Sequence, residues 1–322
     1  MTSRALASLW LYAIAAFMSG CASQALPRHV DAARSLPMIV AHRGGTADFP
    51  ENTLLAISGA LEHRADAIWL SVQLTRDGVP VLYRPADLSA NTDGRGTVAN
   101  MEFAALAQLN AGFNFASTDA NGATVYPYRA HPLRVPTLAE ALNAIPPSIP
   151  VMLDMKALPA DRQAAAVARV LDEANAWNRT LLYSTDAAYQ TAFAAYPRAR
   201  LFESRDATRR RLANVALAHD CSPPPPGGWA AFEWSRKMEL VETFTLGEAR
   251  SAVTAKLWTP QAMTCFRARG DAHVMAIGID DAEGYRAAAC LGIDAVLVDS
   301  PRTMQAIRER IGQPLQCADE AH

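Results

Sequence analysis

An imidazole and a guanidinium stand next to each other where a short apolar run of the sequence ends. The run covers residues 38–41, and His42 and Arg43 follow it directly. A histidine exchanges protons near neutral pH, and an arginine stays charged and can bind a phosphate through two parallel hydrogen bonds. The carboxylate of Glu51 follows in the next turn, just before a helix start. This combination predicts a site for proton transfer beside a bound anion.

Two further sets of side chains alternate along apolar segments. Trp69, Ser71 and Gln73 share one segment, and Asp154 and Lys156 share another. Alternate residues of a β-strand point to the same side of the sheet, so each set can face one site. The fold must therefore bring these two segments together as strands.

Eight strand-like segments alternate with helical patterns along the chain. The strands are predicted at residues 38–42, 67–74, 150–155, 180–184, 199–203, 229–234, 273–279 and 294–298. Helices are predicted at residues 53–61, 137–145, 160–177, 187–196, 206–218, 260–269, 281–291 and 301–311. Such alternation implies parallel strands, and eight units close into a (β/α)8 TIM barrel of the α/β class. An open doubly wound sheet is the alternative, but no G-x-G-x-x-G motif opens the first helix.

Several motifs resemble those of the glycerophosphodiester phosphodiesterase family. They are HRG and PEN near His42, followed by LNAGFNF, RVPTLAEAL, VMLDMK and the terminal LGIDAVLVDSP. The resemblance implies a TIM barrel of the PLC-like phosphodiesterase type, with an insertion after the second strand at about residues 84–136 that covers the substrate. It also implies hydrolysis of glycerophosphodiesters to glycerol 3-phosphate and an alcohol.

The resemblance assigns roles to individual residues. His42 corresponds to the first of two histidines that act as general acid and base, with Arg43 as its phosphate-binding neighbour. Glu51 corresponds to the carboxylate of the PEN motif, so the expected catalytic residues are His42, Arg43 and Glu51. Asp154 stands where the family has a glutamate that binds a divalent cation, and Lys156 matches a lysine that faces the phosphate.

Three positions depart from the family pattern. Trp69 and Ser71 replace the Glu-x-Asp pair of metal ligands, and Arg84 replaces the second histidine. Mg²⁺ and Ca²⁺ need several oxygen ligands, whereas an indole only donates and a serine offers one neutral oxygen. An arginine cannot exchange a proton near neutral pH. We expect a degenerate metal site with Asp154 as its remaining ligand, holding no metal or a weakly bound Mg²⁺ or Ca²⁺.

Three interpretations stay open at this point. In the first, the alignment is locally shifted and other carboxylates complete a metal site: Asp66, Asp87 and Asp93. In the second, the pocket binds a phosphate without a metal through Arg43, Arg84 and Lys156. In the third, Trp69 fills the pocket and the protein is structural. The function is then that of a phosphodiesterase-like protein with weak or lost activity, or of an inactive envelope protein that binds a phosphate or phospholipid headgroup.

The N-terminus predicts export and lipidation. An apolar run at residues 6–18 is too short to span a membrane and precedes a Met-Ser-Gly-Cys sequence that ends at Cys21. We expect a lipoprotein signal peptide at residues 1–20, a linker at 21–36, the barrel at 37–313 and a tail at 314–322. Lipidation of Cys21 would anchor the protein in the cell envelope, on the periplasmic side of the outer membrane. The net charge of −2 gives no reason to expect a nucleic acid partner.

Four cysteines remain after Cys21, namely Cys221, Cys265, Cys290 and Cys317. One or two disulfides are expected in an oxidising compartment, but the sequence does not choose among the pairings. Asp299 precedes a Ser-Pro pair, and we interpret it mainly as the N-cap of the last helix.

Overall fold

A computed structural model describes residues 35–311 and 315–317. The predicted signal peptide, the lipidation site at Cys21 and most of the predicted linker lie outside these residues. No helix of the described part is both long and apolar enough to cross a membrane.

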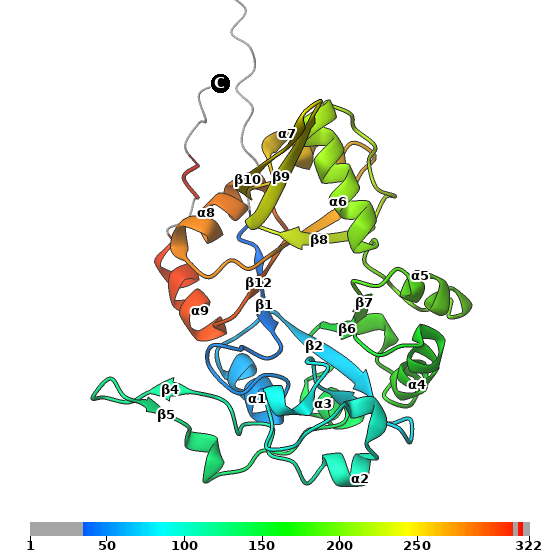
Figure 1. Cartoon of the computed structure of the whole chain (residues 1–322), viewed down its shortest axis with the longest axis vertical. Coiled ribbons are helices and arrows are strands. Elements are labelled where there is room, and N and C mark those ends of the chain that lie inside the picture. Colours follow the sequence, from blue (N-terminus) through cyan, green and yellow to red (C-terminus); the bar gives the residue numbers. More distant parts are fainter. Residues whose placement is uncertain (1–34, 312–314, 318–322) are drawn as a thin grey trace, which may run out of the picture. The chain divides into compact units, whose positions relative to one another are not determined.

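Seven strands form a continuous parallel sheet (Figure 1). In spatial order they are β7 (Thr180–Tyr183), β6 (Val151–Met155), β2 (Ala67–Leu74), β1 (Met38–His42), β12 (Ala295–Val298), β11 (His273–Ile277) and β8 (Trp229–Glu233). Residues 201–202 close the ring, because Leu201 bridges to β7 and Phe202 bridges to β8, both in parallel. The ring therefore has eight parallel members, as the strand and helix pattern predicts, and the fold is a TIM-type (β/α)8 barrel.

The helices that follow the strands are α1 (Leu54–Glu62), α3 (Leu138–Ala144), α4 (Ala160–Glu173), α5 (Ala188–Ala192), α6 (Arg205–Ala213), α7 (Pro260–Phe266), α8 (Ala282–Leu291) and α9 (Pro301–Arg310). Polar side chains cap all of these helices except α4 and α5, since unpaired N–H groups of a first turn need acceptors. Thr53 accepts from the amide of Ala56, and Thr137 forms a reciprocal capping box with Glu140. Each helix buries its apolar side against the outside of the sheet, which produces two large clusters of buried side chains around the barrel.

A third cluster fills the inside of the barrel. It takes alternate residues from successive strands, including Val40, Trp69, Met152, Tyr183 and Phe202. Inward-facing residues in layers make the interior of such a barrel a packed core rather than a pore. Substrate can therefore reach only the mouth, where the strands end.

The long connection after β2 contains one short strand, β3 (Pro80–Leu82), that pairs antiparallel with β2. Beyond it lie η1 (Leu88–Ala90), η2 (Val98–Asn100), α2 (Phe103–Leu106), the two-residue strands β4 (Ser117–Thr118) and β5 (Thr124–Val125), and η3 (Pro127–Arg129). This segment has a small apolar cluster of its own, with Leu88, Val98 and Leu106 fully or almost fully buried. It is the insertion expected at about residues 84–136.

Two features of the second half are not specified by the sequence patterns. One is a hairpin between β8 and α7, formed by β9 (Arg236–Phe244) and β10 (Gly247–Ala255). The other is the disulfide pairing, which is Cys221 with Cys265 and Cys290 with Cys317. The second disulfide ties the C-terminal segment to α8. Loops of 44 and 27 residues closed in this way restrict the unfolded chain, which stabilises the fold by about 3–4 kcal/mol each.

Candidate active site

His42, at the end of β1, is held by a carboxylate that follows the last strand of the barrel. Its Nδ1 lies 2.6 Å from Oδ1 of Asp299, which directly follows β12. The interpretation of Asp299 as a helix N-cap is wrong, because Ser300 caps α9 by accepting from the amide of Thr303. The first and last strands of a closed barrel are neighbours, so the residues at their C-terminal ends meet. Closure of the barrel could therefore have predicted Asp299 as the partner of His42.

A second acidic residue supports this pair from the end of β11. The amide of Asp299 donates to Oδ1 of Asp280 over 2.7 Å. Burial raises the pKa of Asp280, whereas the hydrogen bond from His42 lowers the pKa of Asp299. The negative charge is thus favoured on Asp299, directly beside the imidazole, where the carboxylate holds the ring in place.

The lowered pKa of Asp299 predicts a pH dependence of stability. A carboxylate of this kind stabilises the fold fully above its ordinary pKa of 3.8, and the contribution is lost as the pH falls through the lowered value. We expect the Asp299→Asn variant to lose less stability than the parent protein as the pH falls from about 4 to about 2. Denaturation midpoints measured at stepped pH test this, and parallel curves for the two proteins would contradict it.

Arg43 lies in a tight turn that anchors it beside Glu51. Its backbone is left-handed, with φ of 51°, and its Nη1 pairs with Oε2 of Glu51. The following Gly44 has φ of 84°, and a Cβ there would lie 2.8 Å from Cβ of Ala56 in α1. Oε1 of Glu51 accepts from Asn91 of the insertion over 3.0 Å. The turn, the first helix and the insertion are therefore joined at the arginine.

Asp154 and Lys156, at the end of β6, form a buried ion pair. Nζ of Lys156 lies 2.9 Å from Oδ2 of Asp154, and the two side chains are only 16% and 8% exposed. Oγ of Ser71 is 3.5 Å from the same oxygen, because β2 and β6 pair with these two residues in register. Oδ1 of Asp154 has no hydrogen-bond partner among the described residues. Burial raises the pKa of Asp154, and the nearby Lys156 and Arg43 oppose that shift.

Similarity to known proteins agrees with this arrangement. The profile of the glycerophosphoryl diester phosphodiesterase family matches residues 42–303. The chain belongs to this family. The uncharacterized protein Rv2277c of Mycobacterium tuberculosis is 46% identical over 273 residues, which are 84% of this chain and 90% of that protein. Mouse glycerophosphodiester phosphodiesterase 1 is 33% identical over 135 residues, which are 42% of this chain and 38% of that protein.

Solved structures of family members have the same fold. The crystal structure of the glycerophosphoryl diester phosphodiesterase domain of Rv2277c is 45% identical, with a TM-score of 0.79 over 85% of this chain and 100% of that one. A phosphodiesterase from Oleispira antarctica, in complex with the product sn-glycerol-3-phosphate, has a TM-score of 0.60 over 85% of this chain and 97% of that one. At 22% identity, the second likeness supports the fold alone.

Trp69, which the resemblance predicts to stand at a metal-ligand position, belongs to the barrel core. Its side chain is almost completely buried, and its ring centroid lies 4.9 Å from that of Tyr183 and 6.0 Å from that of Phe202. Two residues further along β2, Ser71 faces the Asp154–Lys156 pair. The indole therefore fills space below the mouth and offers no ligand to it.

The residues at the mouth do not fit the divalent cation that glycerophosphoryl diester phosphodiesterases typically use. Within residues 35–311 and 315–317, no group of three or more His, Cys, Asp or Glu side chains could hold a metal ion. One carboxylate oxygen of Asp154 is bound to Lys156, which leaves Oδ1 and the hydroxyl of Ser71 as oxygen donors. Even Mg²⁺, which keeps several waters, is usually held by one or two free carboxylates, whereas the carboxylate here is already paired with an ammonium, so this set does not fit a divalent cation.

The carboxylates of the shifted-alignment interpretation are engaged elsewhere. Asp66, at the N-terminal end of β2, accepts from the amide of Ile39 and pairs with Arg308. Asp87 caps η1 through the amide of Ser89, and Asp93 accepts from the amide of Asn110. None of the three forms a hydrogen bond or ion pair with Asp154.

Unlike Arg43 and Lys156, Arg84 is not paired with a carboxylate of the described residues. It is exposed at the start of the insertion, and its guanidinium forms no hydrogen bond or ion pair with the described residues. Its backbone carbonyl accepts from Nε2 of Gln73 over 3.3 Å. The structure thus fixes Arg43 and Lys156 in place and leaves Arg84 unrestrained.

Three polar side chains that were not predicted from the sequence lie at or just beyond the ends of three further strands: Tyr183, Arg205 and Glu233. Arg205, at the start of α6, pairs with Glu233 at the end of β8, and its guanidinium lies 4.7 Å from the ring of Phe232. Arg205 also lowers the pKa of Tyr183, although burial raises it more strongly. These residues belong to no sequence motif, so only their positions at strand ends could have identified them.

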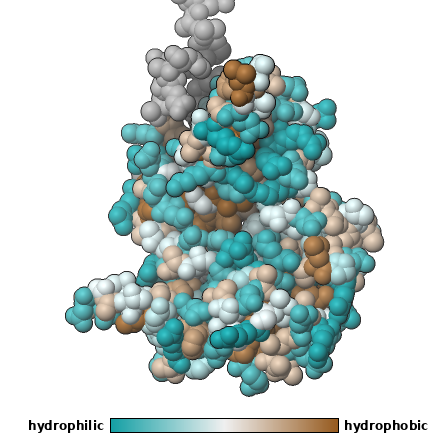
Figure 2. Space-filling model, viewed as in Figure 1, coloured by the Kyte–Doolittle hydropathy of each residue, from teal (hydrophilic) through white to brown (hydrophobic). Residues whose placement is uncertain are grey.

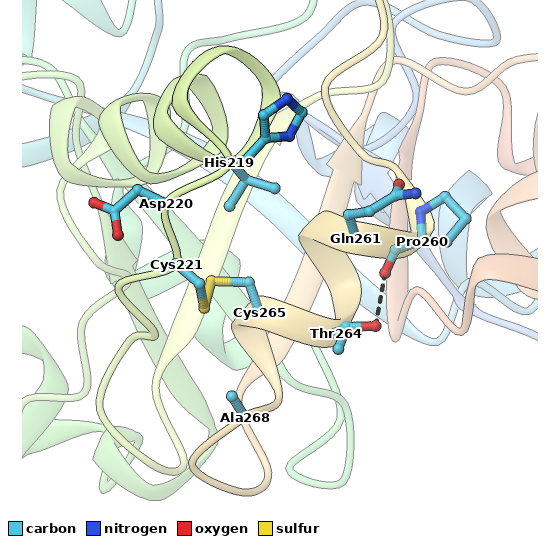
Figure 3. Close-up of a pocket in the computed structure, with 9 residues that line it drawn as sticks. His219, Asp220, Cys221, Pro260, Gln261, Thr264, Cys265 and Ala268 are labelled. Atoms are coloured by element: carbon cyan, nitrogen blue, oxygen red, sulfur yellow. Dashed lines mark hydrogen bonds between the residues drawn. A yellow bond between two sulfur atoms is a disulfide. The ribbon is translucent and has the colours of Figure 1, made fainter.

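A cavity of about 410 Å³ lies away from all these residues. It is lined by Val215 of η6 (Asn214–Ala218), the segment from His219 to Cys221, α7 and Ala268 just beyond it, with the Cys221–Cys265 disulfide in its wall (Figure 3). No residue of the predicted site lines it, so we place the active site at the barrel mouth.

Proposed function

We propose that the barrel mouth binds the phosphate of a glycerophosphodiester and hydrolyses the ester weakly or not at all. Membership of the family and the retained His42, Arg43 and Lys156 support the first part. The observation that carries the second part is the Asp154–Lys156 ion pair, because the carboxylate that would bind a metal is already neutralised by an ammonium.

The retained groups have complementary roles in this proposal. Asp299 accepts from Nδ1 of His42, which leaves Nε2 as the atom that exchanges a proton with the ester or with water. Arg43, restrained by Glu51, and Lys156, restrained by Asp154, would contact the phosphate oxygens. Charge-assisted hydrogen bonds from fixed cations bind a phosphate without further reorganisation.

The groups that are missing from the barrel mouth explain why we expect weak hydrolysis. Arg84 stays protonated and cannot replace a second histidine, and one acid–base group typically contributes about 10²–10⁴-fold in rate. The side chains that remain also lack the oxygen ligands for a cation that would polarise the phosphoryl group.

A second candidate function is binding without catalysis. In this proposal the protein is a lipoprotein, anchored through Cys21 to the outer membrane and facing the periplasm, that binds phosphate-containing headgroups. The restrained cations Arg43 and Lys156 favour it, because each is held in place by its own carboxylate even when nothing is bound.

Glycerol 3-phosphate release and binding distinguish the two candidates. We expect little release from glycerophosphocholine, with the same rate in Mg²⁺, in Ca²⁺ and in chelator. Calorimetry should show binding of sn-glycerol 3-phosphate at low salt, weakened at least about tenfold by Arg43→Gln. Arg76→Gln is the matched control, because Arg76 pairs with Glu102 on the surface.

Rapid turnover that chelator abolishes and that His42→Ala removes would overturn the expected weakness. Slow turnover that depends on His42 but ignores chelator would identify a weak enzyme. Binding with no turnover would support the second candidate, binding without catalysis. No binding by the parent protein would refute both candidates.

A further inference from the structure

The β9–β10 hairpin has one apolar face that nothing in the described structure covers. In the strand pairing, Met238 lies opposite Val253 and Phe244 lies opposite Gly247, with Leu240 between them on the same face. Their side chains are large, and Met238, Leu240, Phe244 and Val253 are 41%, 49%, 59% and 40% exposed. The space-filling view shows a hydrophobic patch where the end of this hairpin lies in Figure 1 (Figure 2).

The opposite face of the hairpin is mainly polar, with Val241 as its one large apolar side chain. Arg250 pairs with Glu239 across the strands and with Glu248 along its own strand. Every residue from 237 to 254 is exposed, and β9 and β10 pair only with each other among the described strands. An isolated two-stranded hairpin is marginally stable in water, so an amphipathic one of nine residues per strand calls for a partner on its apolar face.

The pattern of charges decides which partner fits. Glu242 lies on the apolar face between Leu240 and Phe244, and a bilayer would disfavour a carboxylate at that position. The apolar side chains of β9 also extend over seven residues, from Met238 to Phe244, or about 20 Å, which suits the face of another sheet. At the base of the hairpin, Arg236 lies on the same face as Glu242 and carries the opposite charge.

We propose that this face binds the same face of a second copy of the chain. If the two hairpins pack antiparallel about a two-fold axis at residue 239, Met238 of each copy faces Leu240 of the other. The same axis places Arg236 of each copy opposite Glu242 of the other. Stacked sheets lie about 10 Å apart, a separation that these long side chains can bridge.

The contact would be modest in size and close to the barrel mouth. With this axis the two hairpins overlap over residues 236–242, roughly 20 by 10 Å with Phe244 just outside, which is less than the roughly 800 Å² per partner of a stable complex, so association depends on concentration. Arg236 also lies 3.4 Å from Glu233, the mouth residue that pairs with Arg205. This inference does not depend on the proposed function.

Sedimentation velocity of the full chain into the high micromolar range tests the proposal. We expect a reversible dimer, and we expect Arg236→Glu or Glu242→Arg to make the protein monomeric. An equal mixture of these two variants should dimerise again, because each like-charged contact is then replaced by an opposite-charged one. Lys237→Glu is the matched control, since it reverses a neighbouring charge on the polar face and should leave the dimer intact.

Several outcomes would refute the inference. A monomer at every concentration would do so, as would a dimer that survives both charge reversals or one that Lys237→Glu disrupts equally. Binding of the parent protein to phosphatidylcholine vesicles, lost in Leu240→Asp, would assign the face to a bilayer instead. Unchanged denaturation midpoints of the variants would show that the barrel remains folded throughout.

Discussion

Replacing Lys156 with methionine is expected to lower the free energy of unfolding by about 3–5 kcal/mol. The change removes the ammonium that lies 2.9 Å from the Asp154 carboxylate while keeping much of the apolar stem. Asp154 is then a buried charge that keeps a hydrogen bond from the neutral Ser71, at 3.5 Å, and the weaker attraction of the nearby Arg43. Denaturant unfolding at neutral pH measures the loss.

Two further variants separate the buried charge from simple loss of an ion pair. The double variant Asp154→Leu, Lys156→Met should recover most of the stability, because no uncompensated charge stays in the barrel. Arg76→Met removes an ion pair whose two members are both more than half exposed, and it should change stability by less than about 1 kcal/mol. If Lys156→Met were as mild as Arg76→Met, Asp154 would have to be neutral or hydrated in the native protein.

The positions of the barrel strands follow from the sequence because strand and helix have different periods of apolar residues. Each of the eight predicted strands overlaps a member of the ring, including the short one at 201–202. His42, Asp154 and Lys156 were predictable for the same reason, since each lies at or just beyond the end of an apolar strand.

The partners of these residues were less predictable, because they come from distant parts of the chain. Asp299 is 257 residues from His42, and only closure of the ring brings the two together. The β9–β10 hairpin was missed for another reason. Its residues are exposed on both faces, and Val241 and Glu242 interrupt the alternation of apolar and polar residues along β9.

Trp69 shows where motif comparison and packing give different information. The resemblance to the family predicts a ligand position there, but the register pairs Trp69 with Met152, one inward-facing layer below the level of Ser71 and Asp154. The aromatic contacts with Tyr183 and Phe202 are long-range, and no local pattern in the sequence encodes them.

We expect the combined change Trp69→Glu, Ser71→Asp and Arg84→His to destabilise the protein without creating a metal site. Removing a buried tryptophan alone lowers the free energy of unfolding by about 3–5 kcal/mol, because the cavity relaxes only partly. A glutamate in its place adds a charge against the apolar rings of the barrel core. The ammonium of Lys156 would still bind Asp154 at the position where a cation would need an oxygen.

Unfolding with and without saturating Mg²⁺ or Ca²⁺ tests this expectation. A metal that binds only the folded state raises the free energy of unfolding by an amount set by its concentration and affinity, so a restored site would reveal itself without any turnover. We expect no such rise, and Trp69→Phe, which keeps an aromatic ring against Tyr183, should lose less stability than Trp69→Ala. A metal-dependent gain in the triple variant would mean that the three substitutions alone removed the cation. Its absence would show that the Asp154–Lys156 ion pair and the filled core have replaced the metal site as a unit.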